Sequence, residues 1–313
     1  MKTYFITGVM GFVGSHWAEN ILNNGNKVIG IDIHEGYAKL FKYNNFEFIK
    51  DSIIDNKEKL FNLIKRSDYV LHLASVAEPD QYITHPRKII KIAALAAIDI
   101  IDISIDLKKK IFFTSTSEIY GKNNKIPFKE DDDRVLGSTT IKRWCYSSSK
   151  AIVEHYLEAC AANDEIDYSV VRLFNVYGPR IKGRVVSHFI NNSLNNKDLE
   201  INGTGKQTRC FTYIDDVINA FNLILDSDKC KNQIFNIGTD HEISIEEFAK
   251  KIINITNSKS KLVSISYNDQ FGKSYEDIER RVPDISKIRN FVSWKPSTNL
   301  EDGIKLMIKK DYY

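Results

Sequence analysis

The sequence is poor in cysteine, and its few cysteines are not spaced for a disulfide scaffold or a metal site. Cys145, Cys160, Cys210 and Cys230 are the only four in 313 residues, and no two form a Cys-x-x-Cys pair. The seven histidines show no metal-ligand spacing with each other or with these cysteines, so no metal is expected. We therefore interpret the cysteines as reduced thiols of a cytoplasmic protein.

A strong excess of charge of one sign is also missing. Lys plus Arg total 44 and Asp plus Glu total 41, so the net charge is +3. A surplus this small gives no electrostatic footprint for nucleic acid, and no such partner is expected. Long uninterrupted apolar runs are lacking too, because the apolar stretch Ile89–Ile105 contains Lys91, Asp99 and Asp102. We therefore expect no membrane span and no membrane partner.

The chain does have the balance of an ordinary globular protein, with 42% hydrophobic and 27% charged residues. Its first half alternates short strand patterns with helical ones, which predicts βαβ units in an α/β fold, a doubly wound parallel sheet of the Rossmann type. The helical patterns cover Val13–Leu22, Arg87–Leu107 and Cys145–Ala162, and the strand patterns cover Lys2–Thr7, Lys27–Ile33, Phe46–Ile49, Tyr69–Ala74, Ile111–Thr116 and Tyr168–Phe174.

The regular alternation fades from about Val176, where glycine and asparagine become frequent. We predict an NAD-binding domain over residues 1–174, to which residues 212–240 return with the strand Gln233–Ile237. The remaining residues, 175–211 and 241–313, are predicted to form a smaller C-terminal substrate domain.

The segment from Thr7 to Gly14 reads Thr-Gly-Val-Met-Gly-Phe-Val-Gly and lies between a strand and a helix. A glycine triplet alone also occurs in ordinary tight turns, but in this context it lets the backbone approach a pyrophosphate at a helix N-terminus. Asp32 closes the second strand. A carboxylate there accepts both ribose hydroxyls and repels a 2′-phosphate, so NAD is favoured over NADP.

Tyr146 and Lys150 have the i, i+4 spacing that puts two side chains on one helix face. Pairs with this spacing also arise by chance, so their meaning comes from the glycine turn upstream and from the end of the fifth strand. Thr116, Ser117 and Glu118 stand at that strand end, and open α/β sheets bind ligands at the C-terminal ends of their strands.

These motifs, in this order, resemble those of the extended short-chain dehydrogenase/reductases that act on nucleotide sugars. The resemblance implies an NAD-dependent enzyme with a nucleotide-sugar substrate, UDP-linked by preference, and a homodimer formed through the helices around 87–107 and 145–162. It covers essentially the whole chain, continuing through Arg172–Pro179, Gly183–Ile190, Gln207–Phe211, Trp294–Pro296 and Leu300–Gly303.

The resemblance also implies roles for single residues. Tyr146 is the base for the sugar 4-hydroxyl, Thr116 hydrogen-bonds the same hydroxyl, and Lys150 binds the nicotinamide ribose and lowers the tyrosine pKa. Bringing a tyrosine from pKa 10 to neutral pH takes roughly 4 kcal/mol, which an ammonium and the positive nicotinamide ring can supply. The predicted catalytic set is Tyr146, Lys150, Thr116, Ser117, Glu118 and Arg281.

The implied binding residues are more numerous. Asp51 would meet the adenine, Arg209 would clamp the pyrophosphate, Asn175 would contact the diphosphate or the sugar, and the segment from Val185 would line the nucleotide-base pocket. The cofactor set is Gly8, Gly11, Phe12, Val13, Gly14, Asp32, Asp51, Ile53, Leu73 and Ala74 with Tyr146 and Lys150, and the substrate set is Glu78, Tyr82, Asn175, Arg184, Val185, Phe189, Arg209 and Arg281.

Glu118 helps to distinguish the possible reactions, because simple 4-epimerases usually carry a small residue at this position. The Thr-Ser-Glu motif resembles that of two subfamilies, the GDP-mannose 4,6-dehydratases and the UDP-glucuronate decarboxylases. The second subfamily includes the decarboxylase domain of the enzyme that makes aminoarabinose for lipid A. Arg143-Trp144, Gly183–Ile190 and Arg280–Asp284 resemble the decarboxylases, so oxidation at carbon 4 followed by decarboxylation, with possible hydride return, is favoured.

Three alternatives stay open at this point. One is a dehydratase in which Glu118 abstracts the carbon-5 proton, and another is a UDP-sugar 4-epimerase. The third is an NAD-binding protein that does not catalyse a reaction. A purely phosphate-binding role for Arg281 also remains open.

Overall fold

The computed structural model describes residues 1–266, 276 and 278–311, and it divides into two compact units. The first unit comprises Met1–Ile119, Lys142–Arg172 and Phe221–Phe235, and the second comprises Tyr120–Ile141, Leu173–Ala220 and Asn236–Tyr313. The segment 120–141, which the predicted boundaries place with the NAD-binding domain, is part of the second unit.

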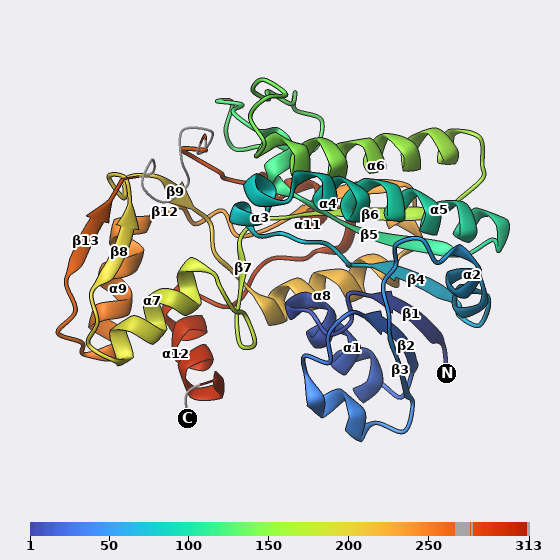
Figure 1. The fold of residues 1–313 in the computed structure, drawn as a ribbon, viewed down its shortest axis with the longest axis horizontal. Helices are drawn as coiled ribbons and strands as arrows, with labels where there is room; N and C mark the ends of the chain where they lie inside the picture. The colour runs from blue at the N-terminus through green and yellow to red at the C-terminus, as the bar shows by residue number, and fades with distance from the viewer. Residues whose placement is uncertain (267–275, 277, 312–313) are drawn as a thin grey trace. The chain divides into compact units, whose positions relative to one another are not determined.

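A seven-stranded sheet carries the predicted doubly wound topology, which is thereby confirmed (Figure 1). Its order is β11-β6-β5-β4-β1-β2-β3, and the pairs from β5 to β3 are all parallel. The sequence order reverses between β1 and β4, and such a switch point is where α/β sheets of this kind bind dinucleotides. The strands are β1 (Thr3–Thr7), β2 (Lys27–Asp32), β3 (Phe46–Lys50), β4 (Tyr69–His72), β5 (Lys110–Thr116), β6 (Tyr168–Leu173) and β11 (Gln233–Ile237).

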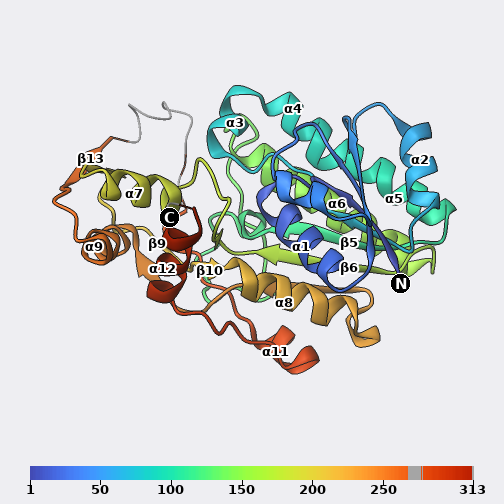
Figure 2. The same ribbon diagram turned by 90° about the horizontal axis from the view of Figure 1, so that it is seen from below.

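Helices cover both faces of this sheet because neighbouring residues of a strand point to opposite sides (Figures 1 and 2). On one face, the ring of Trp17 lies 4.7 Å from the rings of Phe112 and Phe221. On the other, Phe113 belongs to a large apolar cluster. The first face carries α1 (Phe12–Asn23) and the C-terminal part of α8 (Ile214–Leu225), and the second carries α2 (Lys57–Lys65), α5 (Ala96–Asp106) and α6 (Trp144–Ala162).

The helix predicted over 87–107 is present but not uniform. After the short helix α3 (Pro79–Thr84), it runs as α4 (Pro86–Ile90), a π-helical turn (Lys91–Leu95) and then α5. A π turn inserts an extra residue and re-aims the side chains around it, often at a functional site. Ala93, within this turn, is fully buried in a small cluster with Tyr82, Ile89 and Tyr146.

Where its residues are described, the second unit is built from short strands and helices, with three two-stranded sheets. Stacked rings form part of its core, with Phe248 lying 4.3 Å from Phe211 and 6.1 Å from Phe189. Its elements are β7 (Val176–Tyr177), α7 (Val185–Leu194), β8 (Leu199–Asn202), β9 (Thr208–Arg209), β10 (Thr212–Tyr213), β12 (Ile243–Ser244), α9 (Ile245–Thr256), β13 (Leu262–Ile265), α11 (Ser286–Val292) and α12 (Leu300–Asp311).

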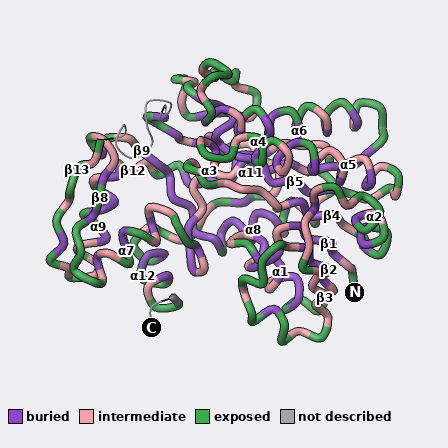
Figure 3. The backbone as a smooth tube through the Cα atoms, in the orientation of Figure 1, coloured by how far each residue is buried: buried purple, intermediate pink, exposed green. Residues whose placement is uncertain are grey.

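Burial agrees with this architecture (Figure 3). In β1, β4 and β5 nearly every residue is buried, which suits parallel strands covered by helices on both faces. Within the described residues, no helix combines the length and the apolar character needed to cross a membrane.

Candidate active site

The glycine turn after β1 is as tight as its sequence suggests. Gly8 has φ +69°, and a Cβ there would lie 2.8 Å from the Cα of Ala74. A Cβ on Gly14 would lie 2.1 Å from the carbonyl oxygen of Gly8. Only glycine fits at these two positions, so α1 starts directly against the turn. The resulting cradle leaves the N-terminus of α1 open to the pyrophosphate of a dinucleotide.

Thr7 ties this turn to the end of β4. Its hydroxyl oxygen accepts hydrogen bonds from the amides of Leu73 and Ala74, both at 3.1 Å, and lies 2.8 Å from Nδ1 of His72. A hydroxyl that already accepts two bonds donates its one hydrogen to that nitrogen. Burial lowers the pKa of His72 to about 3, so the ring stays neutral. The two predicted cofactor residues 73 and 74 are thereby held at the switch point.

Asp32 lies at the end of β2 beside the same turn. One of its carboxylate oxygens accepts the amide of Met10 at 3.0 Å, and the other accepts the amide of His34 at 3.1 Å. These bonds orient the carboxylate, and the residue remains partly exposed. The arrangement fits the predicted contact with a ribose.

Asp51 and Ile53 come directly after β3. Asp51 accepts the amide of Ser52 at 2.7 Å and the side-chain amide of Asn56 at 3.0 Å, and it pairs with Lys59. The hydrogen bond from Lys59 is the main reason that the pKa of Asp51 is lowered. Ile53 is buried in the sheet's apolar cluster.

Tyr146 and Lys150 stand one turn apart on α6, as predicted. The ammonium of Lys150 is buried, donates to the carbonyl oxygen of Thr114 at 2.8 Å, and lies 4.5 Å from the ring centre of Phe113. Burial lowers its pKa to about 7. The ring of Tyr146 stacks on Tyr82 at 4.6 Å with an angle of 12°, so a predicted substrate residue lies against the predicted base.

Thr116, Ser117 and Glu118 close β5 and are all buried. The hydroxyl of Thr116 accepts the amide of Glu118 at 3.2 Å. Both carboxylate oxygens of Glu118 accept hydrogen bonds from Nη2 of Arg143, at 3.1 and 3.0 Å. A guanidinium at this distance favours the ionised form of a carboxyl group.

Arg143 is a functional candidate that the sequence alone did not single out. It stands just before α6, three residues ahead of Tyr146, and it is buried. In the sequence, Arg143-Trp144 is only a point of resemblance to the decarboxylases. Its partner Glu118 is 25 residues away in the chain, so the sequence carries no local signal for the contact.

In the second unit, three predicted substrate residues gather around Cys210. Asn175, with φ +35°, has its side-chain amide 3.5 Å from the carbonyl oxygen of Cys210. Burial, Glu242 and Asp240 raise the pKa of this thiol to about 12, while the cations of Arg209 and Arg281 act in the opposite direction. Both guanidinium groups therefore lie within electrostatic reach of one buried side chain.

Arg209 also supports the segment that carries Arg281. Its Nη1 donates to the carbonyl oxygens of Thr208, Ile278 and Glu279, at 2.7, 2.8 and 3.4 Å. Neighbouring Arg280 instead forms an ion pair with Glu242 at 2.6 Å.

The other predicted substrate residues lie in different settings. Arg184 and Val185 begin α7 and are half-buried, and Glu78 is exposed just before α3. The ring of Phe189 is 1% exposed and packs in the core of the second unit.

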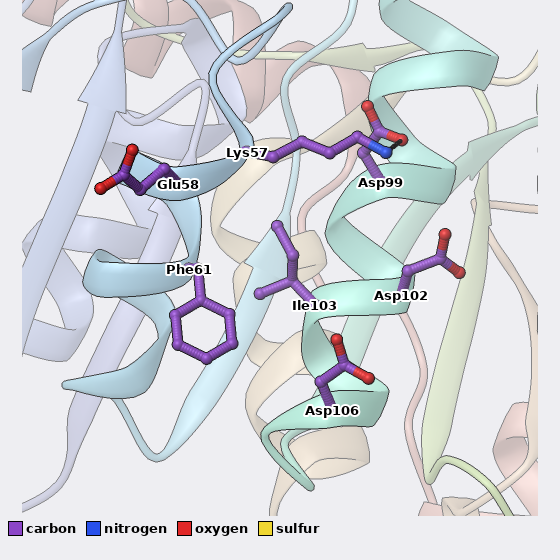
Figure 4. A pocket seen from close by; sticks show the side chains of 7 residues that line it. All are labelled: Lys57, Glu58, Phe61, Asp99, Asp102, Ile103 and Asp106. Atoms are coloured by element: carbon purple, nitrogen blue, oxygen red, sulfur yellow. Dashed lines mark ion pairs between the residues drawn. The ribbon is translucent and has the colours of Figure 1, made fainter.

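A surface pocket of about 340 Å³ lies between α2 and α5 (Figure 4). Lys57 and Asp99 form an ion pair of 2.7 Å across it. Asp102 accepts a hydrogen bond from the hydroxyl of Tyr156 at 2.5 Å. None of the predicted site residues lines this pocket, and in the described part of the chain no cluster of His, Cys, Asp and Glu could hold a metal ion.

A Rossmann-order sheet, a glycine cradle and a buried Tyr–Lys pair together define an NAD-dependent enzyme of the short-chain dehydrogenase/reductase type. The family model described as "NAD dependent epimerase/dehydratase family" matches residues 4–238. The chain belongs to this family, which confirms the resemblance, and it is an NAD-dependent enzyme that modifies nucleotide sugars.

Three proteins similar to this chain are named as enzymes of UDP-sugars. UDP-N-acetyl-alpha-D-glucosaminuronate decarboxylase of Bacillus cytotoxicus is 35% identical over 98% of this chain and 97% of that protein. The structure of UDP-glucose 4-epimerase from Thermotoga maritima with UDP-glucose is 28% identical, covers 98% of both chains and has a TM-score of 0.88. The structure of UDP-glucuronic acid 4-epimerase from Bacillus cereus, in complex with UDP-glucuronic acid and NAD, is 25% identical over 98% of both chains, with a TM-score of 0.88.

Proposed function

We propose that the protein is a decarboxylase of a UDP-linked hexuronic acid. The observation that carries this proposal is the buried Glu118–Arg143 pair at the end of β5. An epimerase that only removes and returns the hydrogen of carbon 4 does not need an acid at this place. The similarity to a UDP-N-acetyl-glucosaminuronate decarboxylase over nearly the whole chain supports the same choice.

The first half-reaction uses Tyr146 and Lys150. Tyr146 takes the proton of the sugar 4-hydroxyl, and Thr116 hydrogen-bonds the same oxygen. The buried ammonium of Lys150 supports the phenolate, since a nearby cation favours a negative charge. NAD, when bound, accepts the hydride of carbon 4 and can return it. The product of this step is a 4-keto sugar.

The second half-reaction depends on the ketone. The substrate carboxylate is then β to a carbonyl group, so carbon dioxide can leave as the electrons of the broken bond move into an enolate. The enolate must then take up a proton at carbon 5, and Glu118, held by Arg143, is the proposed group that delivers this proton from solvent. Arg281 is the proposed cation for the substrate's carboxylate or diphosphate.

A 4-epimerase is the second candidate, because two of the similar structures are UDP-sugar 4-epimerases. A panel of UDP-, GDP- and dTDP-sugars with NAD, read by product mass spectrometry, separates the candidates. We expect turnover of a UDP-hexuronic acid to a lighter product. Products of unchanged mass would indicate epimerisation, and loss of water from a neutral hexose would indicate dehydration.

The carboxylate of Asp32 should make the protein prefer NAD to NADP. A 2′-phosphate would meet this oriented negative charge, so we expect the dissociation constant of NADP to be at least about tenfold higher. Titration calorimetry with both cofactors measures the ratio, and Asp32→Ser should narrow it. Comparable dissociation constants in the unaltered protein would refute the role of Asp32.

We also propose a homodimer formed through α5 and α6. Two large apolar side chains of this region are exposed in the single chain, Leu95 at 54% and Ile152 at 50%. Ile152→Asp should therefore give a monomer in sedimentation velocity experiments, because a buried unpaired charge opposes association. Val263→Asp, a similar change at an exposed residue of β13, is the control and should leave the assembly unchanged. A monomeric unaltered protein would contradict the proposal.

A further inference from the structure

The ammonium of Lys150 lies in an enclosed site in which few groups can balance its charge. Two residues of β5 contact it, Thr114 through its carbonyl oxygen and Phe113 through its ring, and neither group is charged. From β4 it faces His72, whose burial keeps the ring neutral. On its own helix, Tyr146 lies one turn before it and Glu154 one turn after it.

Glu154 is itself buried and paired. Nε of Arg172 donates to both carboxylate oxygens at 3.2 Å, and Nη2 donates to one of them at 2.7 Å. The two side chains are 6% and 7% exposed. Glu154 comes from α6 and Arg172 from β6, so the pair links the helix of Lys150 to the sheet. No residue of the predicted site belongs to it.

We propose that the Glu154–Arg172 ion pair is a positioning device that keeps Lys150 protonated beside Tyr146. This inference rests on the proposed roles of Tyr146 and Lys150 in the first half-reaction. It does not depend on whether decarboxylation, dehydration or epimerisation completes the reaction.

Burial lowers the pKa of Lys150 to about 7, and the negative charge of Glu154 acts upward against it. Glu154 is one helical turn from Lys150, and Arg172 balances most of its negative charge. Removing the carboxylate leaves Lys150 near an uncompensated guanidinium, which disfavours a second cation. Removing the guanidinium leaves Glu154 uncompensated, which favours the ammonium.

The two single variants should therefore move Lys150 in opposite directions. The full-length protein, with specifically ¹⁵N-labelled lysine, is titrated by NMR, and the Lys150 resonance is assigned with Lys150→Met. Glu154→Gln should lower the midpoint of Lys150 by about one pH unit or more, and Arg172→Met should raise it. Glu158→Gln, the same charge change one turn farther along α6 at an exposed residue, should leave it unchanged.

The pH profile of kcat/KM is the second readout. Lys150 must be protonated, so in Glu154→Gln the pH at which half of the maximum remains on the alkaline side should fall, and in Arg172→Met it should rise. A purely structural pair would lower activity in both variants without opposite shifts. The NMR midpoint needs no substrate, so a wrong choice of reaction leaves this test intact.

Breaking a buried pair can prevent folding, so the double variant Glu154→Gln/Arg172→Gln supplies an independent test. It replaces both charges by amides that can still hydrogen-bond each other. Because Glu154 is nearer to Lys150 along the helix, the midpoint should fall below that of the unaltered protein and stay above that of Glu154→Gln. Unchanged midpoints in the double variant, or shifts of one sign in both single variants, would overturn the proposal.

Discussion

Replacing Tyr146 with phenylalanine is expected to lower kcat by roughly a thousandfold while leaving the dissociation constant of NAD nearly unchanged. Loss of a positioned general base typically costs about 10²- to 10⁴-fold in rate. The variant keeps the ring, so the stack on Tyr82 and the helix α6 should persist. Stopped-flow turnover and NAD titration measure the two quantities.

Tyr156→Phe is the matched control for this experiment. It removes a hydroxyl from the same helix, but that hydroxyl bonds Asp102 of α5, which is not a residue of the predicted site. Turnover in this control should stay within about twofold of the unaltered protein, as expected for a change outside the site. Activity of Tyr146→Phe within tenfold of the unaltered protein would contradict the assignment of Tyr146 as the base.

Glu118→Gln has the second large expected effect, because it separates oxidation at carbon 4 from the later loss of carbon dioxide. The substitution keeps the size of the side chain and removes the charge that pairs with Arg143. Since the groups proposed to act on the 4-hydroxyl are Tyr146 and Thr116, with Lys150 supporting Tyr146, hydride transfer should continue. Release of the final product should fall by about 10² or more, the usual cost of losing an acid–base group.

Single-turnover absorbance at the NADH band, read beside product mass, records both steps. The variant should show a normal rise at this band that does not decay, with a 4-keto intermediate held by the enzyme. Normal product at a near-normal rate would mean that Glu118 is structural, and a product of unchanged mass would assign the reaction as a 4-epimerisation.

Much of this architecture could be predicted because it depends on local chemistry. The strands are short runs rich in β-branched and aromatic residues, and Gly14 is required by a contact with Gly8 inside the same turn. The i, i+4 spacing of Tyr146 and Lys150 also defines a shared helix face without any knowledge of the fold.

The features that could not be predicted depend on contacts between distant segments. The π turn at 91–95 places Ala93 in the cluster around Tyr82 and Tyr146, and the periodicity of the helix alone does not show it. The pairs Glu118–Arg143 and Glu154–Arg172 join residues 25 and 18 positions apart. Each charged side chain alone is indistinguishable in sequence from a solvated one.

The central claim is that carbon dioxide leaves the sugar after oxidation at carbon 4, and its most direct test uses a substrate labelled in the carboxyl group. UDP-glucuronic acid and its 2-acetamido counterpart, each with ¹³C in the carboxylate, are incubated with the full-length protein and NAD. We predict release of ¹³CO₂ from at least one of them and a UDP-pentose or 4-keto product without the label. A labelled product of unchanged mass, with no ¹³CO₂, would contradict it.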